Sequence, residues 1–171
     1  MLATLQLHPE AECPSLSRID VSIERSAREW TLRFLLTGQI SALKVPDKTA
    51  ARRTDGLWRH TCCEWFVAED EAYCEFNFSP STEWAAYRFT GYRVGRSDLA
   101  ARAPVIDVRV GEILLELTAR IELNVQAHAK LRYGASAVIE EKSGNKSYWA
   151  LAHPPGKPDF HRASGFVAWV D

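Results

Sequence analysis

The residues best suited to chemistry stand in two neighbouring segments near the middle of the chain. Glu64 lies in the first, and Glu75 and Asn77 lie two residues apart in the second. Carboxyl and amide groups gathered on one surface can bind the hydroxyls of a polar ligand, hold a cation or share a proton. They can equally form a structural network that braces a sheet, and the residues leave both interpretations open.

These segments belong to three consecutive runs that predict β-strands, at residues 57–68, 72–79 and 83–94. Polar turn residues separate the runs. With Glu69 and Asp70 as the first turn, Glu64 and Glu75 are expected to face each other directly across two strands. Like charges in that position cost stability, so the pair needs a compensating group.

Alternation of apolar and polar residues predicts which side chains share a face, because a slip of one residue would reverse both faces. The expected polar face carries His60, Glu64, Glu75, Asn77, Trp84 and Arg88, with Trp58 extending it. The expected core face carries Cys63, Trp65, Val67, Cys74, Phe76, Phe78, Ala85, Tyr87 and Phe89. Trp58 and Trp84 are thereby predicted to form the flat walls of a slot for a sugar or planar ligand.

A second candidate site is the proline-rich loop from His153 to His161. His153, Asp159 and His161 are the side chains in it that could hold a metal or the iron of a haem. Surface or capping roles are the alternative for these histidines. Haem is therefore the one cofactor considered, and no metal site is predicted.

The rest of the chain shows many short alternating segments separated by turn signals. Segments around residues 5–7, 19–23 and 30–36 alternate in period two, and Gly111-Glu112 marks a hairpin. Residues 125–133 could form a short helix or a bulged strand. The pattern predicts an all-β fold, an antiparallel β-sandwich of jelly-roll type with at most one or two short helices, as a single domain over residues 1–171.

Composition excludes several partners. The 171 residues carry a net charge of −1, so we expect no nucleic-acid partner. No apolar run approaches the about 20 residues of a membrane helix, and Met1–Glu10 lacks the pattern of a signal peptide. We therefore expect a cytoplasmic protein without a membrane partner, in which the four cysteines are reduced.

Catalytic signatures are missing from the sequence. It contains no G-x-S-x-G, H-E-x-x-H, phosphate-binding loop or G-x-G-x-x-G. Glu64 and Glu75 could still act as a glycosidase pair, most simply in a retaining mechanism.

The segments LWRHTCCEWF, YCEFNFSPSTEWAAYRFTGYR, SYWALAHP and PDFH resemble the DOMON-like family, which is related to the family 9 carbohydrate-binding modules. The resemblance runs from Leu7 to PDFH and implies an antiparallel β-sandwich, with sugar or haem binding in related members. The matching positions are Trp58, His60, Thr61, Cys62, Glu64, Glu75, Asn77, Ser79, Trp84, Tyr87, Tyr92, Tyr148, Trp149, His153, Asp159 and His161. Cys63 departs from the family, in which an aromatic residue is usual at that position. Secreted sugar-binding relatives carry export signals, which this chain does not show.

Three hypotheses follow. The first is a non-catalytic domain that binds a sugar-like or planar small molecule through Trp58, His60, Glu64, Glu75, Asn77, Trp84, Arg88, His153, Asp159 and His161. The second is a metal-dependent or glycosidase-type hydrolase. The third is a structural or protein-interaction module in which the polar network only braces the sheet.

Overall fold

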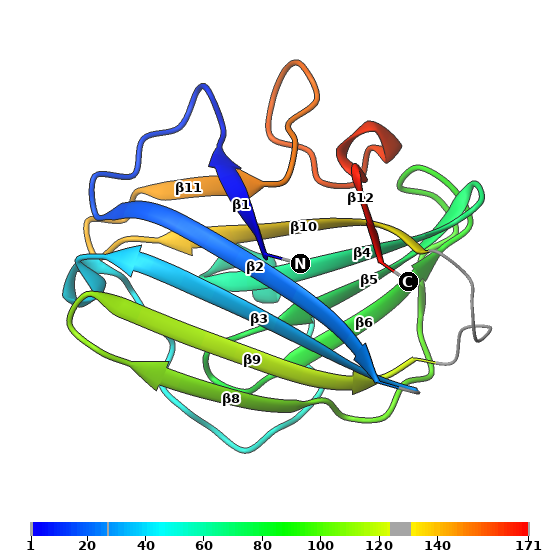
Figure 1. Cartoon of the computed structure of the whole chain (residues 1–171), viewed down its shortest axis with the longest axis horizontal. Helices are drawn as coiled ribbons and strands as arrows, with labels where there is room; N and C mark the ends of the chain where they lie inside the picture. The colour runs from blue at the N-terminus through cyan, green and yellow to red at the C-terminus, as the bar shows by residue number, and fades with distance from the viewer. Residues whose placement is uncertain (1, 27, 124–130, 171) are drawn as a thin grey trace.

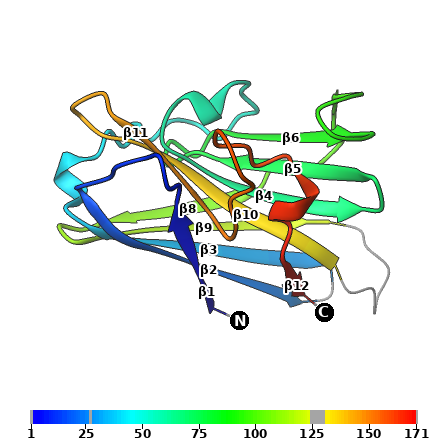
Figure 2. The same ribbon diagram turned by 90° about the horizontal axis from the view of Figure 1, so that it is seen from above.

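The chain forms one curled antiparallel sheet that folds over on itself into two layers (Figures 1 and 2). The computed structural model describes residues 2–26, 28–123 and 131–170. Its strands are β1 (Leu2–Leu7), β2 (Leu16–Ser26), β3 (Glu29–Gly38), β4 (Cys62–Glu69), β5 (Ala72–Phe78), β6 (Trp84–Phe89), β7 (Ser97–Asp98), β8 (Val105–Val110), β9 (Leu114–Glu122), β10 (Leu131–Glu140), β11 (Lys146–Ala150) and β12 (Ala168–Val170). They follow the order β7-β6-β5-β4-β10-β11-β1-β2-β3-β9-β8, and β12 pairs with β10.

Strand β1 joins the two layers. Its first four residues pair with β2 and its last two residues pair with β11, so the sheet turns at this strand. One layer then consists of β2, β3, β9 and β8, and the other of β11, β10, β4, β5 and β6 (Figure 2). This is the predicted antiparallel β-sandwich.

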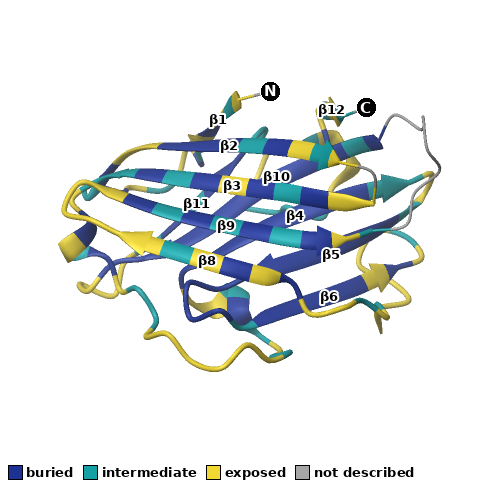
Figure 3. Ribbon diagram, turned by 60° about the horizontal axis from the view of Figure 1, so that its bottom comes forward, coloured by how far each residue is buried: buried dark blue, intermediate teal, exposed yellow. Residues whose placement is uncertain are grey.

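The hydrophobic core lies between the layers. In β3, Trp30, Leu32, Phe34 and Leu36 are buried and alternate with more exposed residues, and β9 shows the same alternation from Leu115 to Ile121 (Figure 3). The opposite layer contributes Cys63, Trp65, Val67, Cys74, Phe76 and Phe78 to the same cluster. Burial of one face of each strand supplies the main stabilising free energy of such a sandwich.

Helical structure among the described residues is limited to three 3-10 turns, η1 (Ile40–Ala42), η2 (Leu57–Arg59) and η3 (Ala163–Gly165). None of these described helices is long and apolar enough to cross a membrane. Of the predicted helix or bulged strand at residues 125–133, residues 125–130 lie outside the described residues and the remainder begins β10.

The strands β4 and β5 are paired two residues out of the predicted register. Asp70 and Glu71 form the turn, so that Glu69 pairs with Ala72. A shift of two residues keeps every side chain on its face, and the core face of both strands is as predicted. It changes the partners across the strands, and the predicted direct pairing of Glu64 with Glu75 is wrong.

The two faces of strand β6 are exchanged relative to the prediction. Trp84 pairs with Phe78, not with Asn77, because five residues, Ser79 to Glu83, connect the strands. Trp84 and Ala86 therefore join the core between the layers, and Ala85, Tyr87 and Phe89 face outward. Either assignment buries apolar residues, so the alternation within this strand alone could not decide between them.

Candidate functional site

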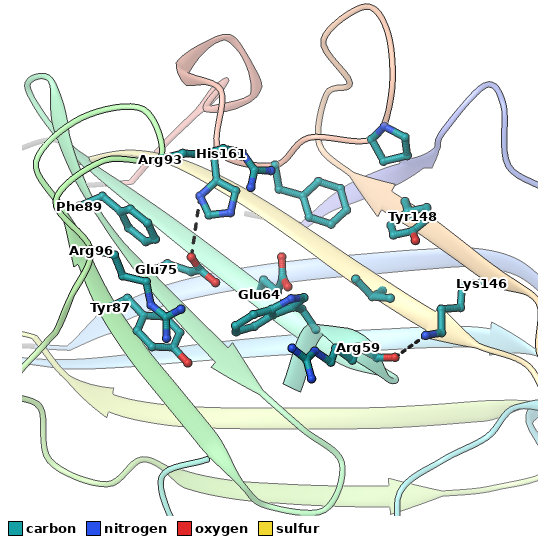
Figure 4. Close-up of a pocket in the computed structure, with 14 residues that line it drawn as sticks. Arg59, Glu64, Glu75, Tyr87, Phe89, Arg93, Arg96, Lys146, Tyr148 and His161 are labelled. Atoms are coloured by element: carbon teal, nitrogen blue, oxygen red, sulfur yellow. Dashed lines mark hydrogen bonds and ion pairs between the residues drawn. The ribbon is translucent and has the colours of Figure 1, made fainter. Parts of the chain in front are cut away.

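A cavity of about 510 Å³ lies on the outer face of the layer formed by β4, β5, β6, β10 and β11 (Figure 4). The turn η2 and the segments around residues 93–96 and 158–161 complete its walls. The lining residues are Trp58, Arg59, Glu64, Glu75, Tyr87, Phe89, Arg93, Arg96, Val138, Lys146, Tyr148, Pro158, Phe160 and His161. The volume falls within the range of about 300–1,000 Å³ that is usual for small-molecule sites.

Register places the two acids of the cavity on adjacent strands. Glu64 lies opposite Asn77 on β5 and opposite Ser136 on β10, whereas Glu75 lies opposite Phe66 and Tyr87. The acids are therefore diagonal neighbours on one face. Each has a polar neighbour that can donate a hydrogen bond to it.

Both acids are buried and hydrogen-bonded. The Ser136 hydroxyl donates to Glu64 Oε2 at 3.0 Å, and Asn77 Nδ2 donates to Glu75 Oε1 at 2.6 Å. Burial, together with the charge of Glu75, raises the pKa of Glu64 to about 8. Burial also raises the pKa of Glu75, against the opposing effects of the Asn77 hydrogen bond and the charges of Arg96 and Arg93. At neutral pH the floor of the cavity thus offers a protonated carboxyl that can donate as well as accept.

His161 closes the cavity above Glu75 (Figure 4). Its Nδ1 lies 2.8 Å from the Tyr73 hydroxyl and 3.9 Å from Glu75 Oε2. Burial, and then the charge of Arg93, lower the pKa of His161 to about 4, so the ring is neutral at physiological pH. The Tyr73 oxygen already accepts a hydrogen bond from the Arg93 backbone N–H. The Tyr73 hydroxyl can donate its own proton to His161 Nδ1 in the tautomer whose ring proton is on Nε2.

Aromatic rings form the side walls. Trp58 meets Tyr87 edge to face with ring centroids 6.2 Å apart, and the Arg96 guanidinium lies 4.1 Å from the Tyr87 centroid. Tyr148 and Phe160 pack at 6.3 Å on another wall. Such rings offer flat apolar surfaces to a ligand whose polar edge meets the acids.

Two arginines come from the chain that follows β6, and partners outside the cavity hold them. Arg93 pairs with Asp159 at 2.9 Å, and the Tyr92 hydroxyl donates to the same carboxylate at 2.5 Å. Arg96 pairs with Asp55 at 3.0 Å. Asp159 therefore does not line the cavity but positions an arginine that does. Hydrogen bonds from Tyr92 and Arg93 outweigh its burial and lower the pKa of Asp159.

The structure thus brings Trp58, Glu64, Glu75 and His161 to one cavity, with Asn77 and Asp159 as supports. It does so partly by routes other than those predicted, since Trp58 belongs to η2 and not to a strand.

Four predicted residues lie elsewhere. Trp84 is in the core, where Arg53 stacks on it at 4.5 Å, so the predicted slot between Trp58 and Trp84 is wrong. Arg88 pairs with Glu69 at 2.5 Å beside the β4–β5 turn and does not neutralise the acids. Both corrections follow from the exchange of the two faces of β6. His60 follows η2 instead of extending β4, and its Nδ1 lies 2.6 Å from Glu140 Oε2.

His153 is likewise separated from His161. Its Nε2 lies 2.8 Å from the Gln6 carbonyl oxygen, and its ring packs edge to face against His8. The two histidines of the loop therefore do not converge on one ligand. The described residues contain no group of three or more side chains suited to holding a metal ion.

Sequence reasoning missed Arg59, Tyr87, Phe89, Arg93, Arg96, Lys146, Tyr148 and Phe160 as cavity residues. Tyr87 and Phe89 were assigned to the core by the reversed β6. Tyr148 did carry a signal, since it matches the family resemblance. The arginines carried none, because charged residues in loops are ordinarily solvent-exposed.

Comparison with solved structures identifies the class of fold. A crystal structure from Bacteroides uniformis, provisionally described as a carbohydrate-binding protein, superposes with a TM-score of 0.66 at 15% identity, over 97% of this chain and 84% of that one. A family 9 carbohydrate-binding module from Caldicellulosiruptor kristjanssonii, in complex with cellotriose, gives 0.56 at 12% identity, over 91% and 74%. The same organism's module in complex with glucose gives 0.52 at 12% identity, over 86% and 72%.

The fold is therefore a β-sandwich like that of the family 9 carbohydrate-binding modules. No protein-family model matches the chain, and no curated protein matches it.

Proposed function

We propose that this chain is a non-catalytic carbohydrate-binding domain that holds a sugar in the cavity above Glu64 and Glu75. The observation that carries the proposal is a cavity with two buried acids on its floor and aromatic rings on its walls. Sugars present hydroxyls that pair with carboxyl groups and C–H faces that pack on aromatic rings. The sugar complexes among the structural neighbours support the same ligand class.

Within this proposal, Trp58, Glu64, Glu75 and His161 contact the ligand, and Asn77 and Asp159 position contacting groups. A membership of the DOMON-like family is the finer proposal that the sequence motifs support. The acids line a cavity that side chains of the chain itself do not fill. This favours a binding role for the acids over a purely bracing one.

The test is titration calorimetry of the full chain with glucose and with cello-oligosaccharides, compared between variants. Trp58→Ala removes a wall of the cavity and is expected to weaken binding about tenfold or more. Trp169→Ala is the matched control, because Trp169 is 58% exposed on β12 and does not line the cavity. We expect the control to bind like the wild type.

Equal affinities of the Trp58→Ala and wild-type proteins would contradict the proposed site. Absence of binding to all saccharides would contradict the function itself. Two further readouts address the alternatives. A haem ligand would give a Soret band that Trp58→Ala weakens, and a glycosidase would release the aglycone from aryl glycosides in a manner that Glu64→Gln abolishes. We expect neither signal.

A further inference from the structure

Four basic side chains line the cavity, but they differ in their partners. Arg93 is paired with Asp159 and Arg96 with Asp55. Arg59 and Lys146 have no acidic partner among the residues that the structure describes. The excess of positive charge at the cavity is local, because the whole chain carries a net charge of −1.

Arg59 and Lys146 lie together on one side of the cavity, away from Arg93 and His161 (Figure 4). Lys146 Nζ donates to the Arg59 backbone oxygen at 2.6 Å, which ties the start of β11 to the end of η2. This bond uses one of the three protons of the ammonium group. The Arg59 guanidinium donates no hydrogen bond to the described residues and keeps all five N–H groups for a ligand.

The acids of the cavity do not neutralise this pair. Glu64 keeps its proton at neutral pH and is hydrogen-bonded to Ser136. The charges that act on Glu75 are those of Arg96 and Arg93, on the other side. Arg59 is exposed and Lys146 is half-buried, and a positive potential thus remains beside them at the side of the cavity.

We infer that the ligand is an acidic sugar, whose hydroxyls meet Glu64 and Glu75 while its anionic group, a carboxylate or a phosphate, is bound by Arg59 and Lys146. This inference rests on the proposed function and adds the charge of the ligand to it. The volume of the cavity, about 510 Å³, suits a small saccharide better than a polyanion such as a nucleic acid.

Calorimetry with matched neutral and acidic sugars tests the inference. Glucose is compared with glucuronate and with glucose 6-phosphate, and galactose with galacturonate. We expect the acidic member to bind about tenfold tighter or more at low salt, because charge-assisted hydrogen bonds are roughly twice as strong as neutral ones. This preference is expected to shrink as salt is added. The carboxylate and phosphate arms distinguish the two anion types.

The variants Arg59→Gln and Lys146→Gln are each expected to remove most of the preference for the acidic sugar. Arg109→Gln on β8 and Lys142→Gln in the β10–β11 turn are matched controls, since both residues are exposed and outside the cavity. The controls should keep the wild-type preference.

Equal binding of neutral and acidic sugars would overturn the inference and leave the proposed function standing. A preference that survives in both Arg59→Gln and Lys146→Gln would also overturn it. Failure of every sugar to bind would remove the inference together with the proposed function.

Discussion

At the residue scale, the two buried glutamates show how one sheet face can hold two acids. Direct opposition would place like charges at closest approach, and the register avoids it by pairing Glu64 with Asn77 and Ser136. A retained proton on Glu64 removes most of the remaining repulsion. The pair is thus compatible with a folded sheet and still offers both a donor and acceptors to a ligand.

The proton on Glu64 makes stability depend on pH. Because its pKa is about 8 in the native state and near 4.3 in an unfolded chain, the native state binds more protons between those values, and the free energy of unfolding falls as pH rises. His161 has the opposite effect, but only between its native pKa of about 4 and its unfolded value of about 6.5. Glu75, whose pKa burial also raises, acts in the same direction as Glu64. Between about pH 6.5 and 8, above the range in which His161 titrates, we expect Glu64 to contribute a loss of about 2 kcal/mol.

Urea unfolding at the two ends of that window measures this loss. Glu64→Gln, which cannot ionise, is expected to flatten the dependence, whereas Glu24→Gln at an exposed position of β2 should retain it. A slope in Glu64→Gln equal to that of the wild type would show that Glu64 is already ionised in the native protein.

At the element scale, the segment that precedes β12 and carries His161 and Phe166 covers the outer face of the sheet. Its position depends on close contact with β10. Gly134 lies opposite Phe66, and a Cβ atom there would lie 2.7 Å from Phe166 Cδ1. Phe166 itself stacks on Phe66 with centroids 5.7 Å apart. The absence of a side chain at residue 134 therefore lets this segment pack onto the outer face of the sheet and hold His161 over the cavity.

Gly134→Ala is accordingly expected to destabilise the protein by about 1–3 kcal/mol through overpacking, and to weaken sugar binding by displacing the segment. Thermal and urea unfolding measure the first effect and calorimetry the second. The double variant Gly134→Ala/Phe166→Leu should recover part of the loss, because the smaller side chain makes room. Additive effects of the two substitutions would rule out this contact as the cause.

At the scale of the whole molecule, the curled sheet buries all four cysteines, and none forms a disulfide. Burial raises the pKa of Cys74 to about 12 and raises those of Cys62 and Cys63 as well, which suppresses the reactive thiolate.

We therefore expect slow reaction of the native protein with a thiol reagent and four titratable thiols after unfolding without reductant. Counting thiols spectrophotometrically in native and denatured samples checks both statements. Fewer than four thiols in the unfolded protein would reveal a disulfide that the fold does not contain. Rapid reaction of the native protein would show that the layers open readily.

The amino-acid sequence by itself determined the all-β class and the outward position of Glu64 and Glu75, because alternation in β4 and β5 leaves only one face that can be buried. It could not decide which face of β6 meets the core. Trp84 and Ala86 on one face and Tyr87 and Phe89 on the other are equally suited to burial. The cavity was decided by tertiary structure alone. Arg93, Arg96 and His161 come from loops whose positions depend on contacts between residues far apart in the chain, and no local pattern encodes those contacts.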